Sequence, residues 1–338
     1  CWCQTPDRGR ARRTAGSASV VHQQLAQHRS RNRSRVVLPF ENANATLLEF
    51  IQSITVYLNQ HGFFVGIHNS EWSIAKERNL LVNSMSGGVD GLILFPISSR
   101  RNLDIVCQMA ASGFPFVSAD TSYYNLPVNC VSSDNVEGGR AVTRHMIESG
   151  HRNLAFLSYE YLDFNTSIKD RYLGFCLAHA DMGIPLHPAN NVIGFRDRIE
   201  DNPQFKMHLS SGGDNRQYRN ELARILKQLI SLGVTAVLAE HDTLAIDLML
   251  TCRENQVSVP DDLSIAGFDD IPMLQRAGIP LTTVHQDFGA LGQTAASLLV
   301  DIIRTKTNPD PYLRYLPTRL VVRGSVRSLS GTAQPVSV

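Results

Sequence analysis

Short apolar runs alternate with longer amphipathic segments along the chain from about residue 35 onward. The apolar runs are typical of β-strands, and they are "RVVLP", "FFVGIH", "GLILFP", "PFVSAD", "NLAFLS", "TAVLAE", "LSIAGF" and "LTTVHQ". Between them, apolar residues recur with helical spacing over 47–59, 135–149, 167–182, 218–232, 242–255 and 288–305. This alternation predicts an α/β fold of parallel strands with helices on both faces of the sheet.

The predicted strands are too many for one compact sheet, which favours two lobes. A chain of 338 residues is long enough for two domains of about 150 residues each. We expect two doubly wound parallel-sheet lobes with a ligand cleft between their strand ends, and a break after "NLAFLS" near Tyr159. The polar stretch 196–217 predicts a surface loop. Four glycines that follow predicted helices suit left-handed C-caps, namely Gly62, Gly150, Gly183 and Gly233.

Charge is nearly balanced over the whole chain but uneven at its amino end. The net charge is +1, whereas residues 1–35 contain eight Arg and a single acidic residue, Asp7. Residues 1–19 show no hydrophobic period, so we expect a disordered Arg-rich tail there, and a second short tail over 331–338. An Arg-rich segment of this kind is either a weak nucleic-acid contact or a solvated linker.

Cysteine usage and the lack of catalytic motifs narrow the class of protein. Four of the six cysteines lie in apolar segments without paired spacing, which is typical of reduced thiols in a cytoplasmic protein. Cys1 and Cys3 could form half of a metal site, but no second Cys/His pair is near, so we expect no metal and no cofactor. No signal-like or membrane-spanning run and no HExxH, GxSxG or Walker motif occurs, so we expect a soluble protein that is not an enzyme.

The stretch "LTTVHQDFGALGQTAASLL" carries the strongest resemblance to a known family. It is preceded by "VSVPDDLSIAGFDD" and followed by "LPTRLVVRGSV", and four further pieces occur earlier, "VDGLILFP", "VSSDNVEGGRAVTRHMIESGHRNLAFLS", "DRYLGFCLAHADMGI" and "AEHDTLAI". Together they resemble the effector-binding core of the LacI/GalR family of transcription regulators. The resemblance implies a type I periplasmic-binding-protein fold, in which the first lobe holds 35–158 and 288–316 and the second holds 159–287 and 317–330.

The same resemblance implies a ligand-responsive repressor that binds a small, sugar-like effector between the lobes. Gln286 would stand at a crossover between them, where an amide can donate to and accept from hydroxyls, although a turn role is the alternative. Asp287 is expected to cap the following helix. The residues expected to bind effector are Phe40, Asn44, Asn69, Ser70, Pro96, Asp120, Arg171, Asp242, Asp269 and Gln286.

Three of these residues have alternative roles that the sequence leaves open. Arg171 offers a planar guanidinium that suits paired hydroxyls, but it could also be a solvated arginine on a helix surface. Asp242 and Asp269 each follow an apolar strand, where ligand groups of parallel sheets belong. Asp242 could equally be a helix N-cap, and a capping role is also the alternative for Asp269.

Residues 20–34 resemble the hinge that joins the DNA-binding head of this family to its core. The resemblance places Leu25 at the apolar wedge of the hinge and Arg29, Arg31, Arg33 and Arg35 near phosphates. Operator DNA is therefore the expected partner of the intact parent protein, although residues 1–19 do not supply the helix-turn-helix of that head.

A homodimer is expected, because a symmetric protein matches a two-fold operator. The apolar segments 80–85 and 105–111 are candidate contacts for it. The alternative function is that of a sugar-binding protein of a transport system, which shares the fold.

Overall fold

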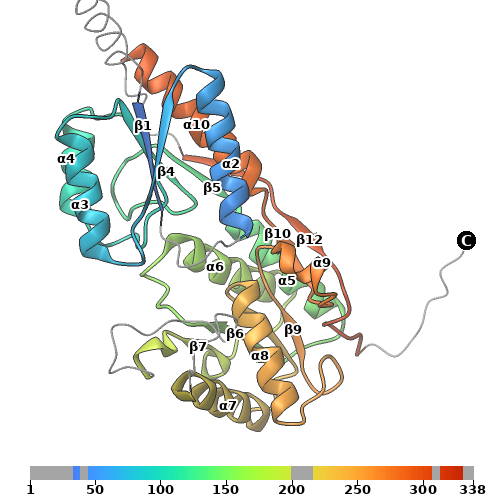
Figure 1. Cartoon of the computed structure of the whole chain (residues 1–338). Coiled ribbons are helices and arrows are strands. Elements are labelled where there is room, and N and C mark those ends of the chain that lie inside the picture. Colours follow the sequence, from blue (N-terminus) through green and yellow to red (C-terminus); the bar gives the residue numbers. More distant parts are fainter. Residues whose placement is uncertain (1–32, 39–44, 199–215, 307–312, 330–338) are drawn as a thin grey trace, which may run out of the picture.

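The computed structural model describes residues 33–38, 45–198, 216–306 and 313–329. Within these residues, two parallel sheets lie toward opposite ends of an elongated molecule (Figure 1). The predicted α/β class with two parallel sheets is therefore confirmed. The predicted tails and most of the predicted hinge and of the 196–217 loop lie outside the described residues.

The first sheet has six strands in the order β11-β5-β4-β3-β1-β2, and every pairing is parallel. Its strands are β1 (Arg33–Leu38), β2 (Phe64–Asn69), β3 (Gly91–Leu94), β4 (Phe116–Ala119), β5 (Cys130–Ser133) and β11 (Leu313–Leu316). Alternate side chains along a strand face opposite sides, so Ile93 packs under one helix pair while Leu92 and Leu94 pack under another.

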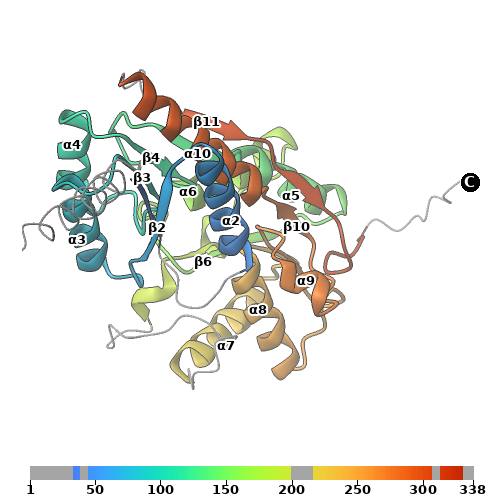
Figure 2. The same ribbon diagram turned by 45° about the horizontal axis from the view of Figure 1, so that its top comes forward.

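Two pairs of helices cover the first sheet. One face packs against α2 (Ala45–Gln60) and α10 (Phe288–Thr305), and the other against α3 (Ile74–Met85) and α4 (Leu103–Ala111). Figures 1 and 2 show α2 and α10 lying side by side, although about 240 residues of sequence separate their Tyr57 and Ser297, whose hydroxyls are 3.0 Å apart. The end of the chain therefore helps to build the sheet that its beginning starts.

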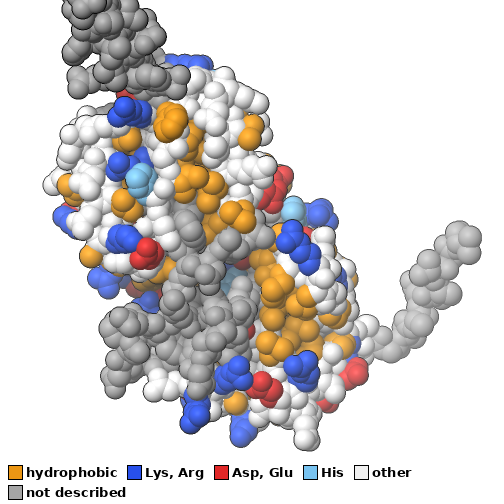
Figure 3. All heavy atoms as spheres, viewed as in Figure 1, with side chains coloured by type: hydrophobic (Ala, Val, Ile, Leu, Met, Phe, Trp, Pro, Cys, Tyr) orange, Lys and Arg blue, Asp and Glu red, His pale blue; other side chains and the backbone are white. Residues whose placement is uncertain are grey.

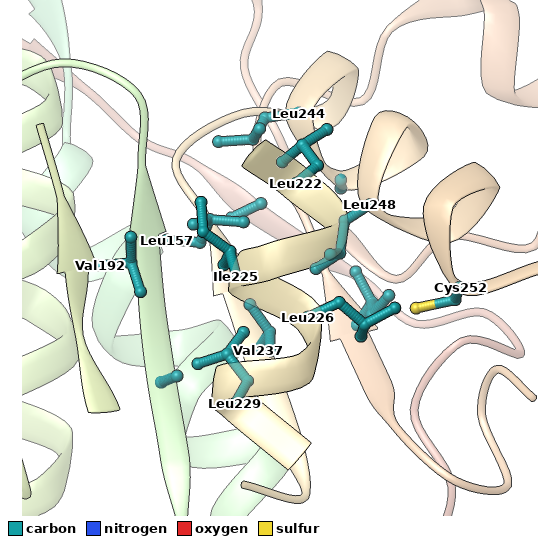
Figure 4. Close-up of a cluster of buried hydrophobic side chains, with 14 of the residues drawn as sticks. Leu157, Val192, Leu222, Ile225, Leu226, Leu229, Val237, Leu244, Leu248 and Cys252 are labelled. Carbon is teal, nitrogen blue, oxygen red and sulfur yellow. The ribbon is translucent and has the colours of Figure 1, made fainter. Parts of the chain in front are cut away.

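The second sheet has four parallel strands in the order β7-β6-β8-β9. They are β6 (Leu154–Ser158), β7 (Val192–Ile193), β8 (Ala236–Ala239) and β9 (Ser264–Ala266). Helices α7 (Arg216–Ser231) and α8 (Asp242–Glu254) bury Leu157 and Val237 on one face of this sheet (Figure 4). Helices α5 (Asn135–Glu148) and α6 (Thr166–Asp181) bury Phe156 and Leu238 on the other.

Strand pairing corrects one predicted boundary. The family resemblance implies that 35–158 lies in the first lobe, and the strand pattern predicts a break after "NLAFLS". In the structure that segment is β6, which pairs with β7 and β8 of the second sheet, and α5 before it packs against α6. The chain therefore leaves the first sheet after β5. The apolar pattern of β6 shows that the strand is buried, but not which sheet contains it.

A two-stranded antiparallel ribbon, β10 (Thr283–His285) with β12 (Arg319–Val321), lies beside the second sheet. Isolated bridges join this region to the end of β9 and to the segment after it, linking Ala266 to Thr282 and Asp269 to His285. The short helix α9 (Pro272–Arg276) fills the connection from β9 to β10. After β10 the chain passes to α10 on the first sheet, and it returns from β11 of that sheet to form β12. The ribbon is therefore connected to both lobes.

The predicted caps at several helix ends are confirmed by the structure. Asp287 caps α10, since its Oδ1 accepts the Ala290 N–H at 2.7 Å, as predicted. Gly150 and Gly183 follow α5 and α6 with φ of +99° and +65°, a left-handed backbone that glycine adopts without steric cost. In the described part of the chain, no helix combines the length and apolar character that crossing a membrane would require.

Candidate effector-binding site

Arg171 lies in the second turn of α6 and points into the protein instead of into solvent. Its side chain is 7% exposed. Its Nε donates to the Asn135 Oδ1 at 2.9 Å, and its Nη1 donates to the backbone carbonyl of Glu240 at 2.6 Å. The guanidinium carbon lies 4.0 Å from the centre of the Phe268 ring, a cation–π contact. A solvated role for Arg171 is therefore excluded.

Asp269 follows β9 and is the ion-pair partner of Arg171. The distance from the Arg171 Nη2 to the Asp269 Oδ1 is 3.4 Å. Burial raises the pKa of the Asp269 carboxyl, an effect that the positive charge of Arg171 partly offsets and the nearby Asp120 carboxylate reinforces. Asp269 also has a φ of +115°, which for a residue with a Cβ costs roughly 1–3 kcal/mol and is typical of binding sites.

Gln286 follows β10 and its side chain meets that of Asp269. Its Nε2 donates to the Asp269 Oδ1 at 2.6 Å, and only an N–H can face a carboxylate oxygen at that distance. The amide orientation is thereby set, and the Oε1 points the other way. This oxygen is buried and has no hydrogen-bond partner among the described residues. Gln286 is thus a buried acceptor that a bound ligand could satisfy.

Asp120 is the contribution of the first sheet to this cluster. It follows β4 with a φ of +67°, and its Oδ2 lies 3.3 Å from the Thr121 hydroxyl and 3.4 Å from the Ser167 hydroxyl. Burial raises the pKa of its carboxyl, and the charge of Arg171 acts in the opposite direction. Carboxylates from both sheets therefore lie within electrostatic range of the same guanidinium.

A set of hydrogen bonds, here called the interlobe bridge, joins the loops after β3 and β4 to segment 162–167. The Ser99 N–H donates to the Phe164 carbonyl at 2.8 Å, and the Ser122 N–H donates to the Thr166 Oγ1 at 2.9 Å. Tyr124 donates its Oη–H to the Leu162 carbonyl at 3.1 Å. Further members are Ser98 Oγ with the Phe164 carbonyl, Thr121 with Asn165, and the ion pair of Arg100 with Asp163. The two sheets are thus held together beside the polar cluster.

The family model of the periplasmic binding protein-like domain matches residues 143–326, which is more than half of the chain. The chain belongs to the periplasmic binding protein-like family. This match covers the Arg171, Asp269 and Gln286 cluster together with both sheets' later strands.

Several curated relatives of the chain are transcriptional repressors. The arabinose metabolism transcriptional repressor of Halalkalibacterium halodurans is 28% identical over 276 residues, covering 79% of this chain and 68% of the relative. The HTH-type transcriptional repressor PurR of Photobacterium profundum is 29% identical over 296 residues, covering 87% and 81%. The resemblance to LacI-family regulators seen in the sequence is therefore confirmed.

Several solved structures with the same fold are those of transcription regulators. CcpA of Lactococcus lactis superposes with a TM-score of 0.73 at 20% identity, covering 88% of this chain and 99% of that one. A LacI-family regulator from Enterococcus faecium with bound ribose gives 0.68 at 24% identity, covering 88% and 100%. The complex of the regulator CelR with cellobiose gives 0.70 at 22% identity, covering 93% and 92%. The periplasmic-binding-protein-like fold is therefore confirmed.

Asp242 has a different place from the one expected. Its Oδ2 accepts the Ile271 N–H at 2.9 Å and its Oδ1 accepts the Thr283 hydroxyl at 2.5 Å, so both carboxylate oxygens have protein partners. Nor does it cap α8, because the Nδ1 of His241 accepts the Leu244 N–H. Asp242 therefore supports the segments around Asp269 and β10 instead of facing a ligand.

The remaining expected residues of the first lobe that the structure describes lie at or just after the ends of β2 and β3. Asn69 ends β2, and its Oδ1 accepts the Glu71 N–H at 2.8 Å in a turn. Ser70 is fully buried, and its Oγ has no hydrogen-bond partner among the residues that the structure describes. Pro96 is buried after β3. Phe40 and Asn44 lie outside the described residues.

The expected DNA-hinge residues Leu25, Arg29 and Arg31 also lie outside the described residues. Arg33 and Arg35, by contrast, belong to β1, so the first strand starts before the predicted hinge ends. The Nη1 of Arg35 donates to the Leu80 carbonyl at 3.2 Å and to the Ser84 hydroxyl at 2.9 Å. Arg35 therefore ties β1 to α3 and is not placed to contact a phosphate.

Sequence reasoning missed several groups of the cluster. Ser167 lies four residues before Arg171 on one face of α6, and this spacing could have revealed it. Asn135 opens α5 directly after the crossover from β5 and orients Arg171, a role without a local signal. Glu240 is buried, accepts from Ser158 and from the Tyr159 N–H, and has its pKa raised to about 8 by that burial.

Among the described residues, no group of three His, Cys, Asp or Glu side chains is arranged to hold a metal ion.

Proposed function

We propose that this chain is the effector-binding core of a LacI-family transcriptional repressor, and that its effector is a small sugar-like molecule bound between the two lobes. One observation carries the proposal. Arg171, Asp269 and Gln286 from the second lobe and Asp120 from the first form a buried polar cluster, in which the Gln286 Oε1 has no partner among the described residues. The planar guanidinium of an arginine and the carboxylates at the carboxyl ends of parallel strands are suited to bind the paired hydroxyls of a sugar.

The lobes of this proposal follow the observed sheets. The first holds residues from β1 to β5 together with 288–316, and the second holds residues from α5 to β10 together with 317–330. An effector that touches Asp120 and Asp269 at once would stabilise the closed arrangement of the lobes. Through the shared ribbon it would shift the population of two core states and thereby the affinity of the parent protein for operator DNA.

The proposed repressor acts as a cytoplasmic homodimer. In the expected contact segments 80–85 and 105–111, Leu81, Ile105 and Met109 are buried in the first lobe's own core, whereas Val82 is 38% exposed. A different face carries exposed apolar side chains, those of Leu48 and Val56 on α2 and Phe64 on the edge strand β2, which are 50%, 49% and 63% exposed. Figure 3 shows hydrophobic side chains along α2 and others farther down, near α8 and α9. This face is the proposed dimer contact.

Titration calorimetry tests the effector site. The probes are D-ribose, L-arabinose and cellobiose, and we expect at least one of them to bind. Its affinity should fall about 5- to 150-fold in Gln286→Leu, because that change leaves ligand hydroxyls without a partner, at roughly 1–3 kcal/mol. Gln108→Leu, on the exposed face of α4, is the matched control and should bind normally. Equal binding by both variants would refute the site.

The second candidate function is a sugar-binding protein of a transport system, which the family match alone favours equally. The gene sequence upstream of residue 1 separates the two. A helix-turn-helix there supports the repressor, and an export signal supports the transporter.

Light scattering at micromolar concentration tests the dimer, which Val56→Asp should convert to a monomer.

A further inference from the structure

The arginines around the polar cluster are already neutralised. Arg171 pairs with Asp269, and Arg196 pairs with Glu160, their Nη1 and Oε1 being 2.8 Å apart. On the ribbon side, the Nη2 of Arg323 lies 2.6 Å from the Asp270 Oδ1, and His285 contacts the same carboxylate. At the rim, Arg100 pairs with Asp163, and the exposed Lys169 lies over the Tyr124 ring at 5.0 Å.

Asp120 is different, because it forms no ion pair in the part of the chain that the structure describes. The hydrogen-bond partners of its carboxylate there are the hydroxyls of Thr121 and Ser167. Arg171 acts on it electrostatically, but the same guanidinium already serves Asp269. Two carboxyl groups therefore share one cation, so the cluster carries an excess of negative charge when both are ionised.

The cluster also presents acceptors in preference to donors. The Oε1 of Gln286 is buried without a partner among the described residues, and its orientation is set by the bond from Nε2 to Asp269. The contacts of Asp269 with Gln286 and Arg171 both fall on its Oδ1. A ligand that satisfies these oxygens must bring hydrogen-bond donors.

We infer that the site takes an uncharged polyol and rejects sugars that carry a phosphate or carboxylate. This inference rests on the proposed effector site and narrows its ligand class. The phosphate group itself offers almost no hydrogen-bond donor at neutral pH, so that group cannot satisfy the Gln286 oxygen, and it brings negative charge toward Asp120 and Asp269. Hydroxyls donate to these oxygens and add no charge. The site therefore distinguishes neutral sugars from sugar phosphates by charge repulsion as well as by hydrogen bonding.

Asp120 is the residue that we expect to determine this discrimination. Asp120→Asn keeps the size of the side chain, removes its charge and adds an N–H donor that can face an anion. Asp269 is less suited to the test, because its removal would also free Arg171 and disturb Gln286. Asp261→Asn is the matched control, since Asp261 is exposed on the loop between α8 and β9.

The experiment compares matched pairs by titration calorimetry, namely D-ribose with D-ribose 5-phosphate and D-glucose with D-glucose 6-phosphate. For wild type we expect at least one neutral sugar to bind at least about 10-fold more tightly than its phosphate, a difference of about 1.4 kcal/mol. In Asp120→Asn that ratio should shrink by about 5-fold or more, whereas Asp261→Asn should keep it. Exclusion of phosphate by size alone would leave the ratio unchanged in Asp120→Asn.

The outcomes separate the inference from the proposed function. Tighter or equal binding of a phosphate by wild type overturns the inference and leaves the effector site intact. An unchanged ratio in Asp120→Asn overturns the role of Asp120. If no sugar and no sugar phosphate binds, the proposed function itself fails. Should Asp120→Asn not fold, as melting curves would show, the wild-type ratio still decides the ligand class.

Discussion

Replacing Arg171 by alanine tests whether the polar cluster is a supporting structure as well as a binding site. Arg171 joins three segments, since it contacts Asn135 at the start of α5, the Glu240 carbonyl after β8 and Asp269 after β9. Arg171→Ala removes all three contacts and the cation–π contact with Phe268. It also leaves the Asp269 carboxylate, whose side chain is 21% exposed, without its cation.

The magnitude follows from this geometry. Removing one partner of a buried ion pair costs about 3–5 kcal/mol, because the remaining charge has lost its water and gained no substitute. The bond to the Glu240 carbonyl, at 2.6 Å, is a charge-assisted hydrogen bond of the stronger kind. We therefore expect the free energy of unfolding to fall by about 3–5 kcal/mol in Arg171→Ala, whereas a solvated arginine would change it by less than about 0.5 kcal/mol.

Urea denaturation followed by far-ultraviolet circular dichroism measures this change, with an unaltered slope against urea as evidence that the comparison is sound. Arg253→Ala, an exposed arginine near the end of α8, is the matched control. The double variant with Asp269→Ala adds a second test, since it removes the stranded carboxylate. Its loss should be smaller than the sum of the two single losses by about 0.5–3 kcal/mol. A loss below about 1 kcal/mol in Arg171→Ala, or equal to that of Arg253→Ala, would refute the reasoning.

Three further predictions address other parts of the molecule. Because the pKa of Glu240 is raised from 4.5 to about 8, its stabilising contribution is full below pH 4.5 and is lost as pH rises to 8. Glu240→Gln should thus gain stability relative to wild type over that interval in urea titrations, and a pH-independent difference contradicts this. Gly174→Ala should destabilise by about 1–3 kcal/mol or more, because a Cβ would lie 2.1 Å from the Val136 carbonyl oxygen; a normal melting temperature refutes it. Tyr124→Phe removes the bond to the Leu162 carbonyl and should weaken binding of the neutral sugar about 2- to 13-fold in calorimetry, whereas unchanged affinity would mean that the interlobe bridge does not govern closure.

Features decided by neighbouring residues could be predicted from the sequence. Strand and helix periodicity predicted β3, β4, β6 and β8 and the helices α2, α5, α6, α7, α8 and α10, because burial of one face imposes a local pattern. The cap of α10 by Asp287 and the left-handed glycines after α5 and α6 were predictable for the same reason, since each depends on bonds within a few residues. The motif resemblance extended this to the family.

The tertiary structure alone decided which sheet each strand joins and which polar groups meet. The strand β6 is apolar in either sheet, so its pattern could not place it, and the break near Tyr159 was put too late. His241 and Asp242 follow the same strand, yet one caps α8 and the other braces Ile271 and Thr283. Local sequence offers no way to choose between them.

Arg171 shows the physical reason most clearly. Its partners lie 36 residues earlier, at Asn135, and 69 residues later, at the Glu240 carbonyl. An arginine can be buried only where a carboxylate and other hydrogen-bond acceptors surround its guanidinium in the folded protein. Here those groups come together only when both sheets have formed. Periodicity reports only that a residue is on a helix face, and the charges that face it come from segments distant in sequence.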